Sequence, residues 1–202
     1  MAHSDKNIVI TPATGSTSTD PRIVFSGADA SLGPQNITLR AYPTSNGTLS
    51  FEGSAGQLFS ITNNLTGSIF SVNDVSGIPS IEVLATGVVK LAEFGGFVAY
   101  GVSPAVVAAG STQATATALT RPINNITTVP ASSGVILPVA TPGMRVMVRN
   151  GTSSTILRVY PNSGAQLNTL GTNVGLQLEG QANLEFVAFT ATQWYTVNAT
   201  FA

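Results

Sequence analysis

The chain has 202 residues, enough for one large β domain or two small ones. Its eight Lys and Arg residues nearly balance nine Asp and Glu residues, and the net charge of -1 argues against nucleic acid or an anionic membrane as the main partner. The absence of cysteine excludes disulfides, thiolate metal sites and a cysteine nucleophile.

Ionic side chains are scarce. Only 8% of the residues are charged, against about 25% in an average protein, while 43% are hydrophobic. Ser, Thr, Asn and Gln take the place of ions on such a surface, which meets other proteins without the cost of desolvating charges. No apolar run approaches the roughly 18 residues of a membrane helix, so we expect no membrane partner and instead a component of an assembly.

Residues 1–20 are predicted to form an extended N-terminal arm. Ile8, Val9 and Ile10 form a short apolar run, followed by the small, polar, linker-like stretch TPATGSTSTD. We expect this run to pair with the sheet edge of an adjacent subunit.

Residues 21–103 are predicted to form an N-terminal β domain with a regular repeat. Glycines at 47, 56, 67, 77 and 87 recur every nine to eleven residues, and each interval holds a short apolar run rich in β-branched and aromatic residues. The expected strands are Thr48–Phe51, Leu58–Ile61, Ile69–Val72, Ile81–Leu84 and Val88–Leu91. One strand and one turn form the smallest unit of a β meander or of a β-helical rung.

These strands need cover that a short hairpin does not supply, because an isolated two-stranded ribbon is marginal in water. We therefore expect a homotrimer whose interface includes Phe51, Phe59, Ile61, Phe70 and Val72. For residues 47–96, a meander within each chain and an interleaved trimeric prism both remain open. An ordinary monomeric β-sandwich is the alternative to a trimer.

A change of composition predicts a boundary in the middle of the chain. Residues 95–120 are rich in Gly, Ala, Ser and Thr and contain no acid or base, which favours a linker at residues 104–120. Residues 121–202 are predicted to form a C-terminal β-sandwich, jelly-roll-like, from about seven short strands. Alternation along Arg145–Arg149 predicts that Val146 and Val148 lie on the face opposite Met147 and both arginines.

The C-terminal strands are expected at Ile126–Val129, Gly134–Leu137, Arg145–Arg149, Thr155–Tyr160, Gly175–Leu178, Asn183–Phe189 and Gln193–Val197. With the arm and the repeat region, these predict an all-β chain.

No catalytic site, metal or cofactor is expected. The single histidine, His3, lies on the predicted arm, and the chain has no His-x-x-x-His, Cys-x-x-Cys or Gly-x-Ser-x-Gly motif. Asn73 and Asp74 lie in a turn, where we interpret Asp74 as an acceptor for the turn backbone rather than a cation ligand. Trp194 is interpreted as a core anchor of the last strand, with stacking on a sugar as the alternative.

Two stretches resemble modules of tailed-bacteriophage virion proteins. Residues 47–96, GTLSFEGSAGQLFSITNNLTGSIFSVNDVSGIPSIEVLATGVVKLAEFGG, closely resemble a module of virion structural proteins, notably of phages that infect cyanobacteria and other aquatic bacteria. Residues 134–197, GVILPVATPGMRVMVRNGTSSTILRVYPNSGAQLNTLGTNVGLQLEGQANLEFVAFTATQWYTV, are similar to a second module that recurs in phage head and tail proteins. Together the two stretches cover a little over half of the chain.

The resemblance implies a structural protein of the virion, made in the host bacterial cytoplasm, and not an enzyme. The leading hypothesis is a capsid decoration, or cement, protein on the capsid exterior that bridges major capsid subunits, with Ile8, Val9 and Ile10 contacting the capsid. The alternative is a tail-fibre or baseplate component that binds a host glycan through an aromatic residue such as Tyr100 or Trp194. A third hypothesis, a carbohydrate-active enzyme, requires two carboxylates about 5–10 Å apart in one cleft.

Overall fold

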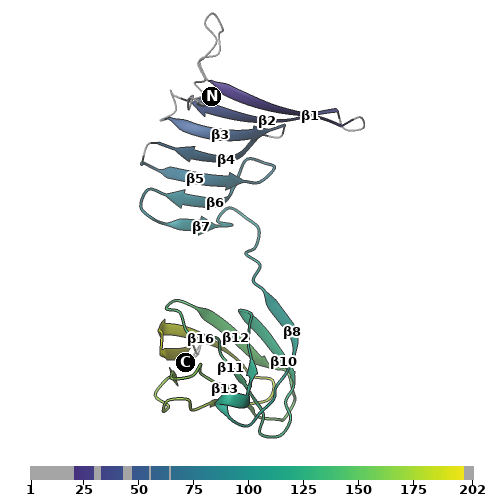
Figure 1. The fold of residues 1–202 in the computed structure, drawn as a ribbon, viewed down its shortest axis with the longest axis vertical. Coiled ribbons are helices and arrows are strands. Elements are labelled where there is room, and N and C mark those ends of the chain that lie inside the picture. The colour runs from purple at the N-terminus through teal and green to yellow at the C-terminus, as the bar shows by residue number, and fades with distance from the viewer. Residues whose placement is uncertain (1–20, 30–32, 43–46, 55, 64, 198–202) are drawn as a thin grey trace, which may run out of the picture. The chain divides into compact units, whose positions relative to one another are not determined.

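A computed structural model describes residues 21–29, 33–42, 47–54, 56–63 and 65–197 of the chain (Figure 1). The chain divides into two compact units, Met1–Val98 and Ala99–Ala202. Within the described residues the structure is nearly all β: one short 3-10 helix, η1 (Gln113–Thr115), is the only helical segment. The all-β class predicted from the sequence is therefore confirmed.

The first unit is one seven-stranded sheet. Its strands lie in chain order, and each runs antiparallel to the next (Figure 1). They are β1 (Arg22–Asp29), β2 (Gly33–Tyr42), β3 (Thr48–Gly53), β4 (Gly56–Thr62), β5 (Ser68–Asn73), β6 (Pro79–Leu84) and β7 (Val89–Leu91). All five strands expected between residues 48 and 91 are present.

The recurring glycines sit in the turns between these strands, except Gly56, which begins β4. Gly77 has φ 79° and Gly87 has φ 84°, a left-handed backbone that residues with a side chain rarely adopt. Their amides close the turns by donating to the carbonyls of Asp74 and Leu84, at 3.0 and 2.9 Å. The spacing of the glycines therefore sets the length of each strand-and-turn repeat.

Side chains alternate across this sheet, apart from register shifts in the β3–β4 and β5–β6 pairings, because successive residues of a strand point to opposite faces. In β4, Phe59 and Ile61 share one face while Ser60 points to the other, and the register carries this pattern into β3 and β5. Figure 1 shows the first unit as a single layer, in which each strand packs on its neighbours in the sheet. One side of the sheet is consequently apolar and the other polar.

The second unit contains a six-stranded and a four-stranded sheet, ordered β14-β17-β16-β12-β10-β8 and β15-β13-β11-β9. The strands are β8 (Val102–Val107), β9 (Thr117–Ala118), β10 (Ile123–Thr128), β11 (Gly134–Ile136), β12 (Arg145–Asn150), β13 (Leu157–Tyr160), β14 (Gln166–Leu167), β15 (Leu176–Leu178), β16 (Asn183–Thr190) and β17 (Gln193–Val197). All seven expected C-terminal strands are among them.

The chain alternates between these two sheets in a solenoid-like arrangement. Strands β8, β10 and β12 pair in parallel in one sheet, and β9, β11 and β13 pair in parallel in the other. Parallel neighbours need a crossover connection, and here each crossover contains a strand of the opposite sheet. A jelly-roll is built from antiparallel strands, so these parallel pairs differ from the jelly-roll-like order expected from the sequence.

The two sheets of the second unit enclose a hydrophobic core. Its members come from both sheets and include Ile126, Val148, Leu157, Val159 and Phe186, which are fully buried. Strand β12 shows the predicted alternation: Val146 and Val148 are buried, whereas Arg145, Met147 and Arg149 are exposed. The second unit thus has a hydrophobic core of its own.

The predicted linker at residues 104–120 is wrong. This stretch contains β9, η1 and most of β8, and β8 and β9 pair with β10 and β11 of the second unit. Ala108 and Leu119 within it are buried in the core. The boundary between the units falls instead at Val98 and Ala99, because small uncharged residues form edge strands here as readily as a linker.

We expect Leu157→Ala to lower the free energy of unfolding of the second unit by about 2–5 kcal/mol, because the side chain is fully buried and its removal leaves a cavity. Ile156→Ala is the matched control: Ile156 is 42% exposed, and the loss should be about 1 kcal/mol or less. Denaturant titration followed by the fluorescence of Trp194, the only tryptophan, measures both. Equal losses in the two variants would contradict the assigned core.

Candidate functional site

The residues predicted for a trimer interface lie on one face of the seven-stranded sheet. Phe51 and Phe59 are opposite each other in β3 and β4, with ring centroids 4.1 Å apart and planes 17° from parallel. The Phe59 and Phe70 centroids are 6.4 Å apart. Ile61 pairs with Phe70, and Val72 pairs with Phe59. The structure therefore brings all five side chains together, although a contact with other chains stays a prediction.

This face extends over the whole sheet, and we call it the apolar face. Its members are Ile23, Phe25, Ile37, Leu39, Ala41, Leu49, Phe51, Phe59, Ile61, Phe70, Val72, Ile81, Val83, Val89 and Leu91. None of them is buried, and Ile61, Leu91 and Val89 are 50%, 51% and 58% exposed. An apolar surface of this extent is rare on a monomeric soluble protein and is typical of an interaction surface.

The opposite, polar face carries the hydrogen bonds. Here Gln57 Nε2 donates to Ser50 Oγ at 3.0 Å, and the hydroxyls of Ser60 and Ser71 are 3.1 Å apart. Ser50 and Ser71 are the only buried residues among those the structure describes in the first unit. This burial is the reverse of the usual pattern in proteins. Small polar side chains are covered by their hydrogen-bonded neighbours, while the aromatic and aliphatic side chains of the apolar face are exposed or half-buried.

The ion pairs between neighbouring strands of the first unit also lie on the polar face. Arg40 Nη1 lies 3.5 Å from Glu52 and donates to the Tyr42 hydroxyl, which in turn donates to Glu52. Burial and the Glu52 carboxylate together raise the pKa of Tyr42 above its usual value, so Tyr42 stays a neutral donor. These contacts pair polar groups of the chain with one another, whereas the apolar face has no cover within its own layer.

The arm residues Ile8, Val9 and Ile10 lie outside the described residues. Their pairing with a capsid subunit remains a prediction.

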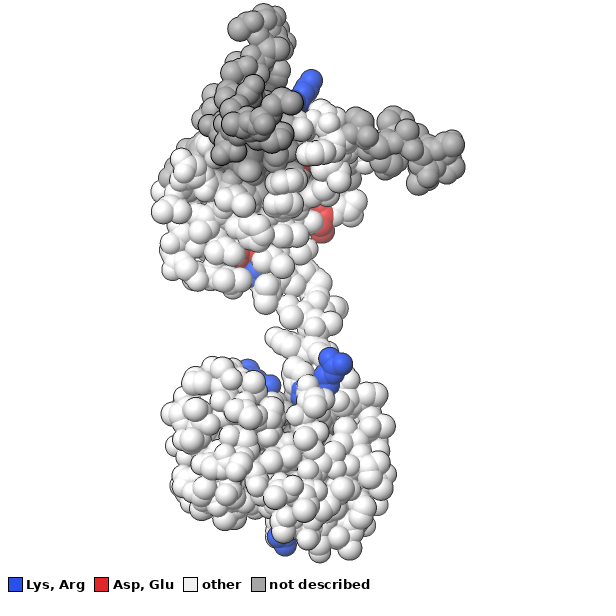
Figure 2. All heavy atoms as spheres, viewed as in Figure 1, with Lys and Arg blue, Asp and Glu red and all other residues white. Residues whose placement is uncertain are grey.

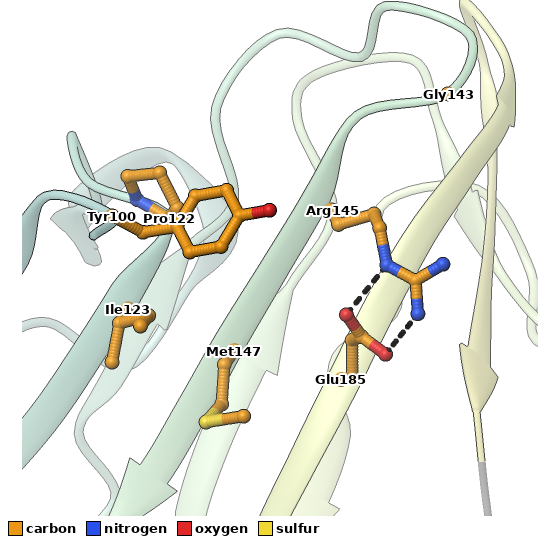
Figure 3. Close-up of a pocket in the computed structure, with 7 residues that line it drawn as sticks. All are labelled: Tyr100, Pro122, Ile123, Gly143, Arg145, Met147 and Glu185. Atoms are coloured by element: carbon orange, nitrogen blue, oxygen red, sulfur yellow. Dashed lines mark hydrogen bonds and ion pairs between the residues drawn. The ribbon is translucent and has the colours of Figure 1, made fainter. Parts of the chain in front are cut away.

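The second unit has a pocket on the outer face of its six-stranded sheet (Figure 3). Ile123, Met147 and Glu185 stand in register on β10, β12 and β16, and Ile123 and Met147 form its floor. Tyr100, which precedes β8 and is 62% exposed, lies on one side, with its hydroxyl directed toward Arg145 (Figure 3). The pocket has a volume of about 360 Å³.

An ion pair forms the other side of this pocket. Arg145 Nε and Nη2 donate to Glu185 Oε1 and Oε2 at 2.7 and 2.6 Å, a two-point contact between planar groups (Figure 3). The guanidinium lowers the pKa of Glu185 below its usual value, and the carboxylate raises the pKa of Arg145. Both groups are therefore held in their charged forms at neutral pH.

Of the two aromatic residues suggested for glycan contact, only Tyr100 is accessible. Trp194 has no exposed surface, and its indole Nε1 donates to Asn162 Oδ1 at 2.9 Å. The interpretation of Trp194 as a core anchor is confirmed, and the sugar-stacking alternative for it is wrong. A buried indole supplies packing area and needs one acceptor, which Asn162 provides.

Three acidic residues of the first unit, Asp74, Glu82 and Glu93, make structural contacts. Asp74 Oδ1 accepts the amides of Ser76 and Ile78 at 2.8 and 3.0 Å, which confirms its role in the turn. Glu82 and Glu93 both contact Lys90 Nζ, at 3.4 and 2.6 Å. In the part of the chain that the structure describes, no three His, Cys, Asp or Glu residues gather to hold a metal ion.

Sequence reasoning did not find most of the pocket. Alternation along β12 places Arg145 and Met147 on one face, but the ion pair joins residues 40 positions apart, and only the register of β12 against β16 brings them together. No local signal marks Glu185 as the partner.

Comparisons of the chain with protein-family models, with curated proteins and with solved structures found no match. In the described part of the chain, no helix is long and apolar enough to span a membrane. Few charged side chains interrupt the visible surface of either unit (Figure 2). The two features that bear on function are the apolar face of the first unit and the pocket of the second unit.

We expect Glu185→Gln to lower the free energy of unfolding by no more than about 1 kcal/mol at neutral pH, because the Arg145–Glu185 pair lies at the surface. A carboxylate with a lowered pKa stabilises the folded state above its unfolded pKa of about 4.3 and loses this effect as the pH falls through the folded value. The difference between Glu185→Gln and the parent chain should accordingly vanish in acid. Denaturant titrations at several pH values measure it, and a difference that grows on acidification would contradict the pairing.

Proposed function

We propose that the chain is a structural protein that assembles through its apolar face into a homotrimer. The observation that carries the proposal is the uncovered apolar face of a single-layer sheet whose opposite face carries the hydrogen bonds between polar side chains. Complete burial of one Val, Leu, Ile or Phe side chain contributes about 1.5–3 kcal/mol. A face composed of such residues therefore gives a strong driving force for association.

The dimensions of the sheet favour three copies. Strands β3 to β6 have six or seven residues and span about 20 Å at ~3.3 Å per residue. Three such sheets, set as the sides of a triangular prism, place each sheet about 6 Å from the axis, close to half of the ~10 Å between packed sheets. Phe51, Phe59 and Phe70 then fill the interior of the prism.

In this proposal each chain contributes an intact β meander, and strands are not interleaved between chains. Hydrogen bonds from β1 to β7 within one chain support it, since the inner strands already have partners on both sides. Association then buries side chains without rearranging backbone hydrogen bonds.

Within this class we propose a phage virion protein, and specifically a capsid decoration protein that bridges major capsid subunits on the outside of the head. Support comes from the resemblance of residues 47–96 and 134–197 to phage virion modules and from the scarcity of charge. The mechanism is mechanical: burial of apolar surface in many copies resists the outward pressure of packaged DNA. No step in it requires a catalytic group.

A tail-fibre or baseplate component is the second candidate. The observation that favours it is the pocket beside the exposed Tyr100, which suits contact with a host surface molecule. A carbohydrate-active enzyme has less support, because the one carboxylate that lines this pocket, Glu185, is bound to Arg145.

The oligomer is tested by mass. We expect light scattering to give three times the 20.7 kDa chain mass for the parent protein, and a smaller species for Ile61→Asp, which places a charge in the proposed interior. Leu65→Asp is the matched control: Leu65 is 74% exposed, lies in the turn after β4 and belongs to neither face of the sheet, so this variant should stay trimeric.

A monomer that stays folded at nanomolar concentration would contradict the self-association proposal. So would an Ile61→Asp variant with the mass of the parent protein.

The place in the virion is tested by copy number. We expect quantitative mass spectrometry of purified phage particles to give hundreds of copies of the chain per particle, as repeated capsid sites require. Tens of copies or fewer would favour the tail component, and absence from the particle would contradict both virion roles.

A further inference from the structure

The pocket on the second unit combines two kinds of surface that the core and the sheet pairing do not use. Its floor is apolar, from Ile123 and Met147, and the ring of Tyr100 stands beside it (Figure 3). Its far side is the planar Arg145–Glu185 pair. Small-molecule sites commonly have this composition, a mostly apolar concavity with a few fixed polar groups, and volumes of ~300–1,000 Å³.

The polar groups of this pocket offer hydrogen bonds without net charge. Among the described residues that line it, Arg145 and Glu185 are the only charged ones, and each neutralises the other. The pair uses Nε and Nη2 of Arg145, which leaves Nη1 as a donor, while the second lone pairs of the carboxylate remain acceptors. The Tyr100 hydroxyl adds a group that both donates and accepts.

This chemistry selects against most ligand classes. An anion meets the Glu185 carboxylate and a cation meets the Arg145 guanidinium, so neither gains from the pair as a whole. A purely apolar ligand buries the ion pair and leaves its remaining donors and acceptors without water or partners. The ligand that fits is neutral, with an apolar face for the ring and the floor and with several groups that donate and accept hydrogen bonds.

We propose that this pocket binds a neutral carbohydrate. The C–H face of a sugar ring packs on Tyr100 and over Ile123 and Met147, while its hydroxyls bond to the Arg145–Glu185 pair and to the Tyr100 hydroxyl. The inference goes beyond self-association, and because every lining residue belongs to the second unit, its failure leaves the trimer proposal intact.

The test is a binding screen of the full chain. Saturation-transfer NMR and calorimetry are run with glucose, galactose, N-acetylglucosamine, maltose and lactose, and with N-acetylneuraminic acid and glucosamine as charged comparisons. We expect at least one neutral sugar to bind more tightly than either charged sugar. Tyr100→Ala should weaken that sugar about tenfold or more through the loss of the aromatic contact.

Two further variants separate the pocket from general surface effects. Tyr195→Ala removes another exposed tyrosine, 42% accessible and in edge contact with Phe189 outside the pocket, and should leave sugar affinity unchanged. Glu185→Gln removes the negative partner of Arg145, so affinity for the neutral sugar should fall while affinity for N-acetylneuraminic acid rises.

Several results would overturn the proposal. One is no binding of any neutral sugar by the parent protein, and another is equal loss in Tyr100→Ala and Tyr195→Ala. A third is protection of the pocket from hydrogen exchange when the protein is assembled but not when it is monomeric. That result would assign the surface to a contact with a second copy of the chain. Circular dichroism of each variant verifies that the β structure is retained.

Discussion

A single-layer β-sheet with an amphipathic pattern has one face that nothing in its own layer covers. In the first unit this constraint determines which side chains remain exposed. Alternation gathers Phe51, Phe59 and Phe70 on the apolar face, and the serines that pair beside them satisfy each other on the polar face. Because a strand cannot change the side on which its residues point, the sheet cannot bury its apolar residues by local rearrangement. Cover has to come from outside the layer.

The second unit buries its apolar side chains within itself. Its chain moves from one sheet to the other and back, so each added strand extends a wall of an enclosed interior, and Phe186 and Trp194 are completely buried there. The two units therefore differ in how they are stabilised. The second has its own core, and the first depends on whatever covers its apolar face.

This division suits a protein that assembles through one unit and binds a ligand through the other. The proposed association uses the apolar face of the first unit, whereas the pocket at Tyr100 belongs to the second unit, which has a hydrophobic core of its own. The low charge content serves both roles, since surfaces that meet other molecules avoid the desolvation of ions, and some of the charges are neutralised in pairs such as Arg145–Glu185.

Much of the local structure follows from the sequence alone. Period-two alternation and regularly spaced glycines predict the strands from Thr48 to Leu91, and alternation along β12 predicts which side of that strand is buried. These features depend on neighbours within a few residues, where backbone geometry and side-chain polarity suffice. The lack of cover for Phe59 and Phe70 also follows from the length of one repeat.

Contacts between distant residues were decided only by the tertiary structure. Residues 104–120 read as a linker because their small, uncharged side chains carry no alternation, yet they pair with β10 and β11. Parallel pairing, the burial of Trp194 against Asn162 and the Arg145–Glu185 pair join residues tens of positions apart. The sequence determines which side chains alternate, but the register between separate strands depends on the packing of the whole unit, and no local pattern encodes it.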